Sequence, residues 1–124
     1  MNKFYVTEDM AEKLRAKGYY REYDVTCDWV EGIFYQVEDG TFHLPRIDEV
    51  LAWLRVDKII SVEPYASASG WRVTICRAYH QDRNDAGGGT CLKSEVEGYN
   101  DGGAFEKYVE ASIAGIEYVI DNLI

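Results

Sequence analysis

At 124 residues the chain has the length of one domain, and its 47% hydrophobic and 28% charged residues are typical of a globular protein. No apolar run approaches the roughly 18 residues of a membrane-spanning helix, and no secretion-type apolar segment follows the N-terminus, so we expect a cytoplasmic protein. The formal net charge of −9 opposes direct binding to nucleic acid, because phosphate contacts need Lys and Arg.

The first predicted element is a helix at about residues 7–17. Thr7 can cap its free N–H groups, and Glu8 and Asp9 favour the positive end of the helix dipole. Gly18 supplies the stop. Residues 19–36 then read as extended, with alternation from Tyr23 to Cys27, a short strand at 33–36 and a turn signal at Asp39-Gly40.

A second helix is predicted at about residues 46–56, with Pro45 near its first turn. Its apolar residues fall at the spacing i, i+3, i+4 and i+7, and Trp53 borders that stripe. A hairpin follows, with one strand at 58–63 that Pro64 ends, a loop of small residues at 66–70, and an alternating strand at 71–79. The stripe consists of Ile47, Val50, Leu51 and Leu54.

Residues 81–103 are irregular, with one further edge strand expected around Leu92 to Val96. The last stretch, 102–124, predicts a helix of about six turns capped by Asn100 or Asp101. Its length makes it the element around which the core forms. The inward stripe comprises Phe105, Tyr108, Val109, Ser112, Ile113, Ile116, Val119, Ile120 and Leu123.

These elements predict a single α+β domain over residues 1–124. An antiparallel sheet of three to five strands packs against two or three helices, because each element has one apolar face to cover. The long C-terminal helix is expected to be the main cover of the sheet.

Three features suggest chemistry. Cys76 and His80 offer a thiol and an imidazole for a small enzyme, but on a strand they lie some 13 Å apart. Residues 87–103 are rich in glycine, and together with Tyr residues they suggest a small-molecule or nucleotide site, although no phosphate-loop pattern is present. The spacing of acidic, His and Cys residues matches no metal signature, so we expect no metal and no cofactor.

The third feature combines aromatic and acidic residues. The net charge gathers in two blocks, 21–50 and 81–124, each at −6. Tyr and Trp dominate binding hot spots because they combine large rigid area with a polar tip, so aromatic residues among carboxylates in the first block suggest a binding face. The candidate binding residues are Tyr19, Tyr20, Tyr23, Trp29, Tyr35, Asp24, Asp28 and Glu31.

The run from Leu44 to Arg55, LPRIDEVLAWLR, resembles a group of small proteins from Bacteroides-type gut bacteria and their phages or mobile elements. Their recurring run is Leu-Pro-Thr, an aromatic, an acid, Val, an aliphatic and Asp-Trp-Leu-Arg. The opening helix, the strands at 59–62 and 71–76, and the closing Asn-Leu-Ile also look alike. The group has no assigned activity, so the resemblance implies architecture and origin and carries over no functional residue. Arg46 departs from the group's Ser or Thr cap.

We therefore favour a non-enzymatic, acidic interaction protein that contacts a protein partner and neither nucleic acid nor membrane. A sharper form is a nucleic-acid mimic that inhibits a basic, nucleic-acid-handling host protein, as in host defence. That form requires the carboxylates to gather on one exposed face. The alternatives are the small-molecule site at 87–103 and the enzyme built on Cys76 and His80. The sequence leaves open whether the chain forms a homo-oligomer.

Overall fold

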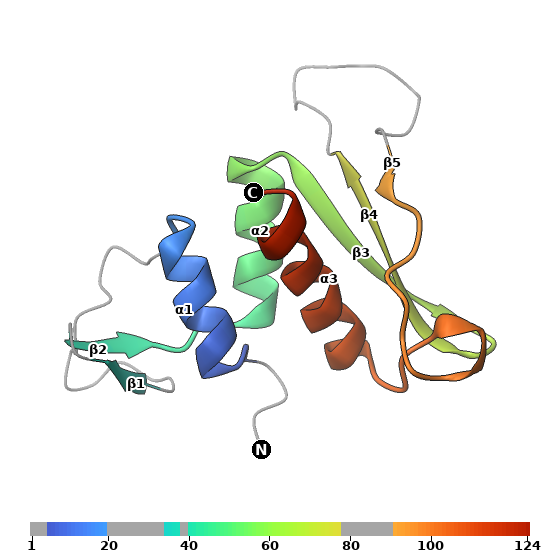
Figure 1. Cartoon of the computed structure of the whole chain (residues 1–124), viewed down its shortest axis with the longest axis horizontal. Coiled ribbons are helices and arrows are strands. Elements are labelled where there is room, and N and C mark those ends of the chain that lie inside the picture. The colour runs from blue at the N-terminus through green and yellow to red at the C-terminus, as the bar shows by residue number, and fades with distance from the viewer. Residues whose placement is uncertain (1–4, 20–33, 38–39, 78–90) are drawn as a thin grey trace.

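The fold is α+β, as predicted, with a three-stranded antiparallel sheet, three helices and a separate two-stranded hairpin (Figure 1). The computed structural model describes residues 5–19, 34–37, 40–77 and 91–124. The alternation predicted from Tyr23 to Cys27 lies outside these ranges. The elements in order are α1 (Glu8–Ala16), β1 (Phe34–Val37), β2 (Gly40–His43), α2 (Ile47–Asp57), β3 (Ile60–Ser67), β4 (Gly70–Arg77), β5 (Cys91–Lys93), the 3-10 turn η1 (Asp101–Gly103) and α3 (Tyr108–Asn122).

The main sheet has the strand order β3-β4-β5, and the helices lie to one side of it (Figure 1). The α3 helix contacts β3 and β4, the α2 helix contacts β3 and α3, and α1 packs on α3. The core between these layers is apolar and closed to solvent. Each fully buried aliphatic side chain contributes about 1.5–3 kcal/mol. Its most buried large residues include Leu14, Leu54, Val62, Val73, Ile75, Ile116 and Val119.

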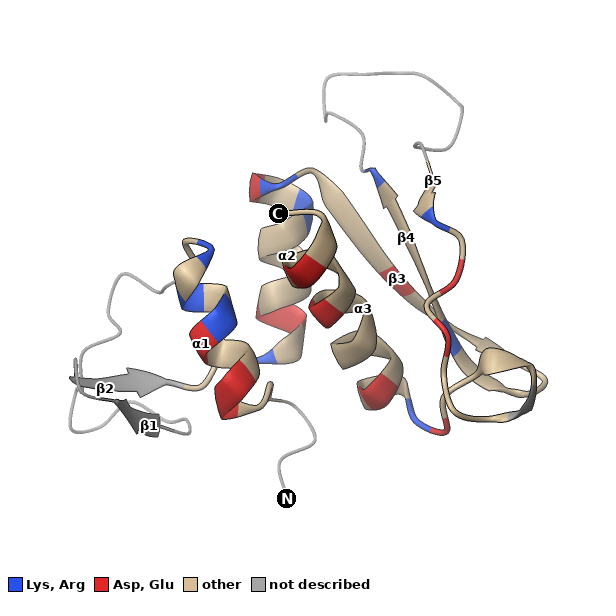
Figure 2. Cartoon of the chain, in the orientation of Figure 1, with Lys and Arg blue, Asp and Glu red and all other residues tan. Residues whose placement is uncertain are grey.

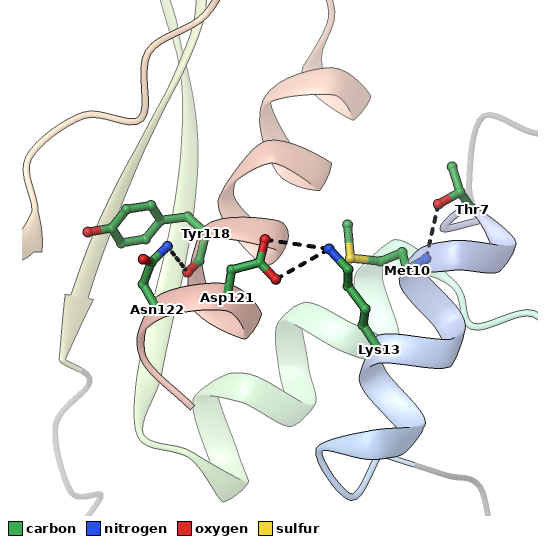
Figure 3. Close-up of polar contacts among 6 residues, drawn as sticks. All are labelled: Thr7, Met10, Lys13, Tyr118, Asp121 and Asn122. Atoms are coloured by element: carbon green, nitrogen blue, oxygen red, sulfur yellow. Dashed lines mark hydrogen bonds and ion pairs between the residues drawn. The ribbon is translucent and has the colours of Figure 1, made fainter.

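The first helix begins where the sequence predicts. The Thr7 side chain accepts a hydrogen bond of 3.2 Å from the Met10 N–H, which satisfies one of the free donors of the first turn (Figure 3). Farther along α1, Lys13 Nζ lies 3.3 Å from Asp121 Oδ1 on α3. This ion pair joins the first and last helices across the surface, as Figure 3 shows.

The second helix also matches its prediction within a residue at each end, and the departure at Arg46 has a structural consequence. Arg46 occupies the N-cap position and forms no side-chain cap bond. Its Nε instead donates to Asp48 Oδ1 at 3.1 Å. At the other end, Ile59 reverses the chain with φ of 57°, a left-handed conformation in which glycine is usual.

The hairpin of β3 and β4 is confirmed, but the prediction that Pro64 ends the first strand is wrong. The strand continues to Ser67, and Pro64 lies opposite Val73 within the ladder. An edge strand needs hydrogen bonds on one side only, and β3 is at the edge, so a proline without an N–H is tolerated there. Val73 and Ile75 face the core, as the alternation of the second strand predicts.

The last helix is shorter than predicted, and the prediction that Asn100 or Asp101 caps it is wrong. It begins at Tyr108, after Lys107, which forms no side-chain cap bond. Asn100 precedes η1 instead, where Gly102 turns the chain with φ of 77°. Phe105 lies outside the helix because it pairs with Trp71 of β4, a contact that local periodicity does not reveal.

Three short strands complete the described elements. The strand predicted at 33–36 is β1, which pairs antiparallel with β2, a strand that the sequence pattern did not predict. The further edge strand is β5, at Cys91–Lys93, and it pairs with β4. Within the described residues, no helix combines the length and apolarity that crossing a membrane requires.

Candidate interaction surface

A backbone bridge brings the segment before α3 onto the end of the hairpin. The Trp71 N–H donates to the Phe105 carbonyl and the Phe105 N–H donates to the Trp71 carbonyl, both at 2.7 Å. This reciprocal pair buries the Phe105 side chain against the core cluster. The bridge therefore fixes the chain immediately before Tyr108, the first residue of α3.

The turn between residues 98 and 104 is closed by its own backbone. The Gly98 N–H donates to the Gly103 carbonyl at 2.8 Å, and the Asn100 N–H donates to the Ala104 carbonyl at 2.9 Å. A Cβ at position 98 would lie 2.3 Å from the Ala104 carbonyl oxygen, so only glycine fits there. The turn presents Tyr99 from a backbone that is already ordered.

Two tyrosines project from this framework into solvent. Tyr99 is 60% exposed and Tyr108 is 43% exposed. The Tyr99 ring meets Phe105 edge-on at a centroid distance of 6.0 Å, and the Tyr108 ring meets Trp71 edge-on at 5.2 Å. Such contacts hold aromatic rings in preferred orientations. Each tyrosine ring is thus held by an aromatic contact and is still accessible to a partner.

The Tyr99 hydroxyl is held at the start of α3. It donates to the Glu110 carboxylate, whose two oxygens both lie 2.8 Å away, and it accepts from the Glu106 N–H at 3.2 Å. The hydrogen bond to Glu110 is the main reason that the pKa of Tyr99 is raised, followed by partial desolvation. We call Tyr99, Tyr108, Glu97, Glu106 and Glu110 the tyrosine surface.

The chain around this surface is acidic. Residues 95–110 contain five acidic side chains and one basic one, Lys107, for a net charge of −4. Glu95 forms an ion pair with Arg72 of β4, whereas Glu97 and Glu106 are exposed. Figure 2 shows this acidic colouring before α3 and along its first turn. The tyrosines therefore lie in a segment with a net negative charge.

The structure does not bring the predicted binding residues together as a described surface. Tyr19 is only 6% exposed and meets Trp53 edge-on at 5.0 Å, so it is a core residue. Burial of that ring removes it from any binding face. For Tyr35 the structure describes the backbone alone, opposite Phe42 in the β1-β2 ladder. The other predicted binding residues lie outside the described ranges: Tyr20, Tyr23, Asp24, Asp28, Trp29 and Glu31.

The described carboxylates do not form one continuous array. They are distributed over the three helices, β3 and the 95–110 segment, and on α1 the acidic residues lie toward the start and the basic ones toward the end (Figure 2). Several are paired with cations, which lowers the local negative potential. The nucleic-acid-mimic form of the hypothesis requires a single array, so the described part of the chain gives it no support. The paired carboxylates are Glu12, Asp48, Glu95 and Asp121.

The described residues also give little support to the hypothesis of a small-molecule site. A shallow cleft of about 380 Å³ lies between α1 and α3, and Thr7, Met10 and Glu117 are among its lining residues. Neither the described tyrosine residues nor the described part of the glycine-rich segment, 91–103, lines it, and residues 87–90 lie outside the described ranges. No group of three or more His, Cys, Asp and Glu side chains among the described residues could hold a metal ion.

The hypothesis of a small enzyme depends on Cys76 and His80. His80 lies outside the described residues. Burial is the largest cause that raises the pKa of the Cys76 thiol, and the Glu63 carboxylate acts in the same direction. A nucleophilic cysteine needs the opposite shift, because the thiolate is the reactive form. Cys76 is therefore poorly suited to nucleophilic catalysis at neutral pH.

Comparisons with protein-family models, with curated proteins and with solved structures give no match to this chain. Function must therefore be argued from the geometry alone. The tyrosine surface was missed in the sequence because Tyr108 fitted the helical stripe. Tyr99 carried a usable signal, since an aromatic residue between Gly98 and Asn100, in a polar glycine-rich turn, has no apolar neighbours to bury it.

Proposed function

We propose that this chain is a non-enzymatic interaction protein whose tyrosine surface binds a basic partner protein. The observation that carries the proposal is the pair of exposed rings, Tyr99 and Tyr108, held edge-on against Phe105 and Trp71 and flanked by carboxylates. No enzymatic step is part of the proposal.

Binding energy in protein interfaces concentrates in a few rigid aromatic and Arg residues. Ordering flexible side chains on binding costs about 0.5–1.5 kcal/mol each, so rings that are already oriented retain more of their contact energy. The reciprocal Trp71–Phe105 bridge and the closed turn at 98–104 supply this order before any partner arrives. The surface is therefore suited to a partner without large rearrangement.

The charge defines the class of partner. The net charge of −4 over residues 95–110 attracts a basic surface and repels an acidic one. Arg and Lys side chains of the partner would also meet the exposed tyrosine faces, where cation–π contact contributes about 0.5–1 kcal/mol. The resemblance around Leu44 to Arg55 supports a bacterial, phage or mobile-element origin, and a basic host protein that handles nucleic acid fits this chemistry.

The test compares three baits in affinity purification from Bacteroides-type bacteria. They are the wild type, the Tyr99→Ala/Tyr108→Ala double variant and the Tyr65→Ala control. Tyr65 is also 43% exposed. Successive side chains of a strand point to opposite faces, so Tyr65 lies on the other face of the sheet from Val62 and Pro64, away from α3. A truncated hot-spot tyrosine lowers affinity about tenfold or more.

The proposal predicts a basic protein that the wild type and Tyr65→Ala recover and the double variant loses. Its yield falls in about 0.5 M NaCl, because salt screens charges beyond a few ångströms. With the purified partner, the double variant raises Kd at least about tenfold, and Glu106→Gln lowers the association rate. The same proteins on all three baits, an acidic partner, or a second copy of the chain bound through these tyrosines would contradict the proposal.

A further inference from the structure

Two cysteines lie directly opposite each other in the outer part of the main sheet. Cys76 of β4 and Cys91 of β5 are partners in the antiparallel register, next to an irregularity between Ile75 and Cys76. Opposite residues of an antiparallel pair have Cα atoms about 4.5–5.5 Å apart and side chains on the same face. This spacing lies within the 4.4–6.8 Å, approximately, that a disulfide bond spans.

Both thiols are free in the structure, and their accessibility differs. Cys91 is exposed, whereas Cys76 is half-buried. After burial and the Glu63 carboxylate, the neighbouring Cys91 thiol also contributes to raising the pKa of Cys76, as expected for two side chains in contact. An oxidant in solution therefore reaches Cys91 first, and Cys76 is placed to react with the product.

We propose that Cys76 and Cys91 form a thiol-pair modification site that a low-molecular-weight disulfide such as oxidised glutathione converts reversibly into an intramolecular disulfide. The Cys91 thiolate attacks one sulfur of the oxidant, forms a mixed disulfide and releases one small thiol. Cys76 then loses its proton to solvent and attacks the Cys91 sulfur, which releases the second small thiol. The protein loses two electrons and two protons, and the oxidant is reduced to two thiols.

Register makes this pairing selective. The chain contains three cysteines, so three intramolecular pairings are conceivable. A strand ladder places Cys76 and Cys91 opposite each other, whereas Cys27 lies outside the described residues. The bond closes a ring through residues 77–90. In a reducing compartment the site remains a dithiol, and it closes when disulfide oxidants accumulate. The inference uses no residue of the tyrosine surface and is independent of the proposed function.

The experiment treats the folded, full-length chain with oxidised glutathione at about pH 9, because the raised pKa of Cys76 leaves little of its thiolate at neutral pH. Remaining thiols are then blocked with N-ethylmaleimide. Trypsin cleaves after Arg and Lys, so the three cysteines fall on three different peptides: 22–46, 73–77 and 84–93. Mass spectrometry therefore identifies each pairing directly. Matched variants are Cys91→Ser, which removes the exposed partner, and Cys27→Ser, which leaves the pair intact.

We expect peptides 73–77 and 84–93 to be linked in the wild type and in Cys27→Ser, and dithiothreitol to reverse the link. Closing a ring of this size raises Tm by about 8 °C relative to the reduced chain. Cys91→Ser shows neither the link nor the Tm shift. A link that includes Cys27, a stable glutathione adduct on Cys91 without closure, or a Tm that falls on oxidation would overturn the proposal.

Discussion

A Cβ atom on Gly115 of α3 would lie 2.5 Å from Cγ1 of Val62 in β3. The same atom would lie 2.8 Å from Cγ2 of Val73 in β4. The last helix therefore rests on the sheet at its glycine, with the two valines on either side of the contact. Both are β-branched residues with stiff side chains, so neither can move aside easily.

The substitution Gly115→Ala is expected to destabilise the fold. Alanine favours a helix over glycine by about 1 kcal/mol, but forcing an extra methyl into this contact costs about 1–3 kcal/mol, and both Val62 and Val73 must shift. The difference is a net loss of up to about 2 kcal/mol in the free energy of unfolding, measured by urea denaturation.

The double variant Gly115→Ala/Val62→Ala is the control for this contact. Removing the Val62 methyl groups opens the space that the new Cβ needs, so the two changes should destabilise by less than the sum of the single variants. The change raises stability in an exposed helix. If Gly115→Ala also raises stability here, an added methyl group at this position does not clash with Val62, and the close contact of α3 with β3 is not tight.

Much of this fold follows from local signals in the sequence. The start of α1 follows from Thr7 and the carboxylates behind it, and the hairpin follows from alternation around Val73. The errors come from contacts between distant segments. Pro64 is tolerated because β3 is an edge strand, and Phe105 leaves the helix because Trp71 pairs with it. Neither partner is visible from local periodicity.

The cap of α1 gives a second prediction. Thr7→Ala removes the hydroxyl that accepts the Met10 N–H and leaves that donor without its side-chain partner. We expect a loss of about 1 kcal/mol in unfolding free energy, which corresponds to a Tm about 3–5 °C lower. Thr7→Ser keeps the hydroxyl and serves as the control, with a Tm close to that of the wild type. Equal losses in the two variants would show that the β-methyl group, and not the cap, matters.

Two ion pairs differ in burial and should differ in how much they contribute to the free energy of unfolding. The side chains of Arg72 and Glu95 are 17% and 33% exposed, whereas those of Lys13 and Asp121 are 47% and 44% exposed. Exposed pairs contribute little because water and salt screen them. Glu95→Gln removes a charge beside a half-buried guanidinium that also donates to Ser67 Oγ. We expect it to destabilise by about 1–2 kcal/mol.

Asp121→Asn is the matched change on the exposed pair, and we expect a loss below about 0.5 kcal/mol. Urea denaturation of both variants, at low salt and in about 0.5 M NaCl, separates the two cases. The effect of Glu95→Gln should persist in salt, and that of Asp121→Asn should vanish. Equal effects would mean that burial does not distinguish these pairs.

The candidate site was less predictable than the fold. The sequence directs attention to Tyr19, which the structure buries against Trp53. Composition alone cannot separate a core tyrosine from an exposed one, since burial depends on which distant segments pack around the ring. The helical spacing places Tyr108 in the inward stripe, but at the first turn of α3 its ring meets Trp71 edge-on and remains 43% exposed. The pairing of Cys76 with Cys91 likewise depends on the position of β5.

The last prediction concerns the ionisation of Tyr99. The Glu110 carboxylate accepts a hydrogen bond from the Tyr99 hydroxyl, so the pKa of Tyr99 is raised above that of an ordinary tyrosine. For a group whose pKa is higher in the folded state, the stabilising contribution is complete below the unfolded pKa and is lost as pH rises through the folded pKa. The hydrogen bond to Glu110 therefore stabilises the fold at neutral pH, and its contribution is lost in alkaline solution as Tyr99 ionises.

Carbon-13 NMR of the tyrosine Cζ atoms tests this directly, with Tyr99→Phe assigning the resonance. Glu110→Gln removes the negative charge but keeps an acceptor, so the titration midpoint of Tyr99 should fall toward the ordinary value. Glu97→Gln removes a carboxylate that does not contribute to the raised pKa of Tyr99, and it should leave the midpoint in place. If both variants lower the midpoint equally, the general negative field of residues 95–110 is responsible, and the contact with Glu110 is not.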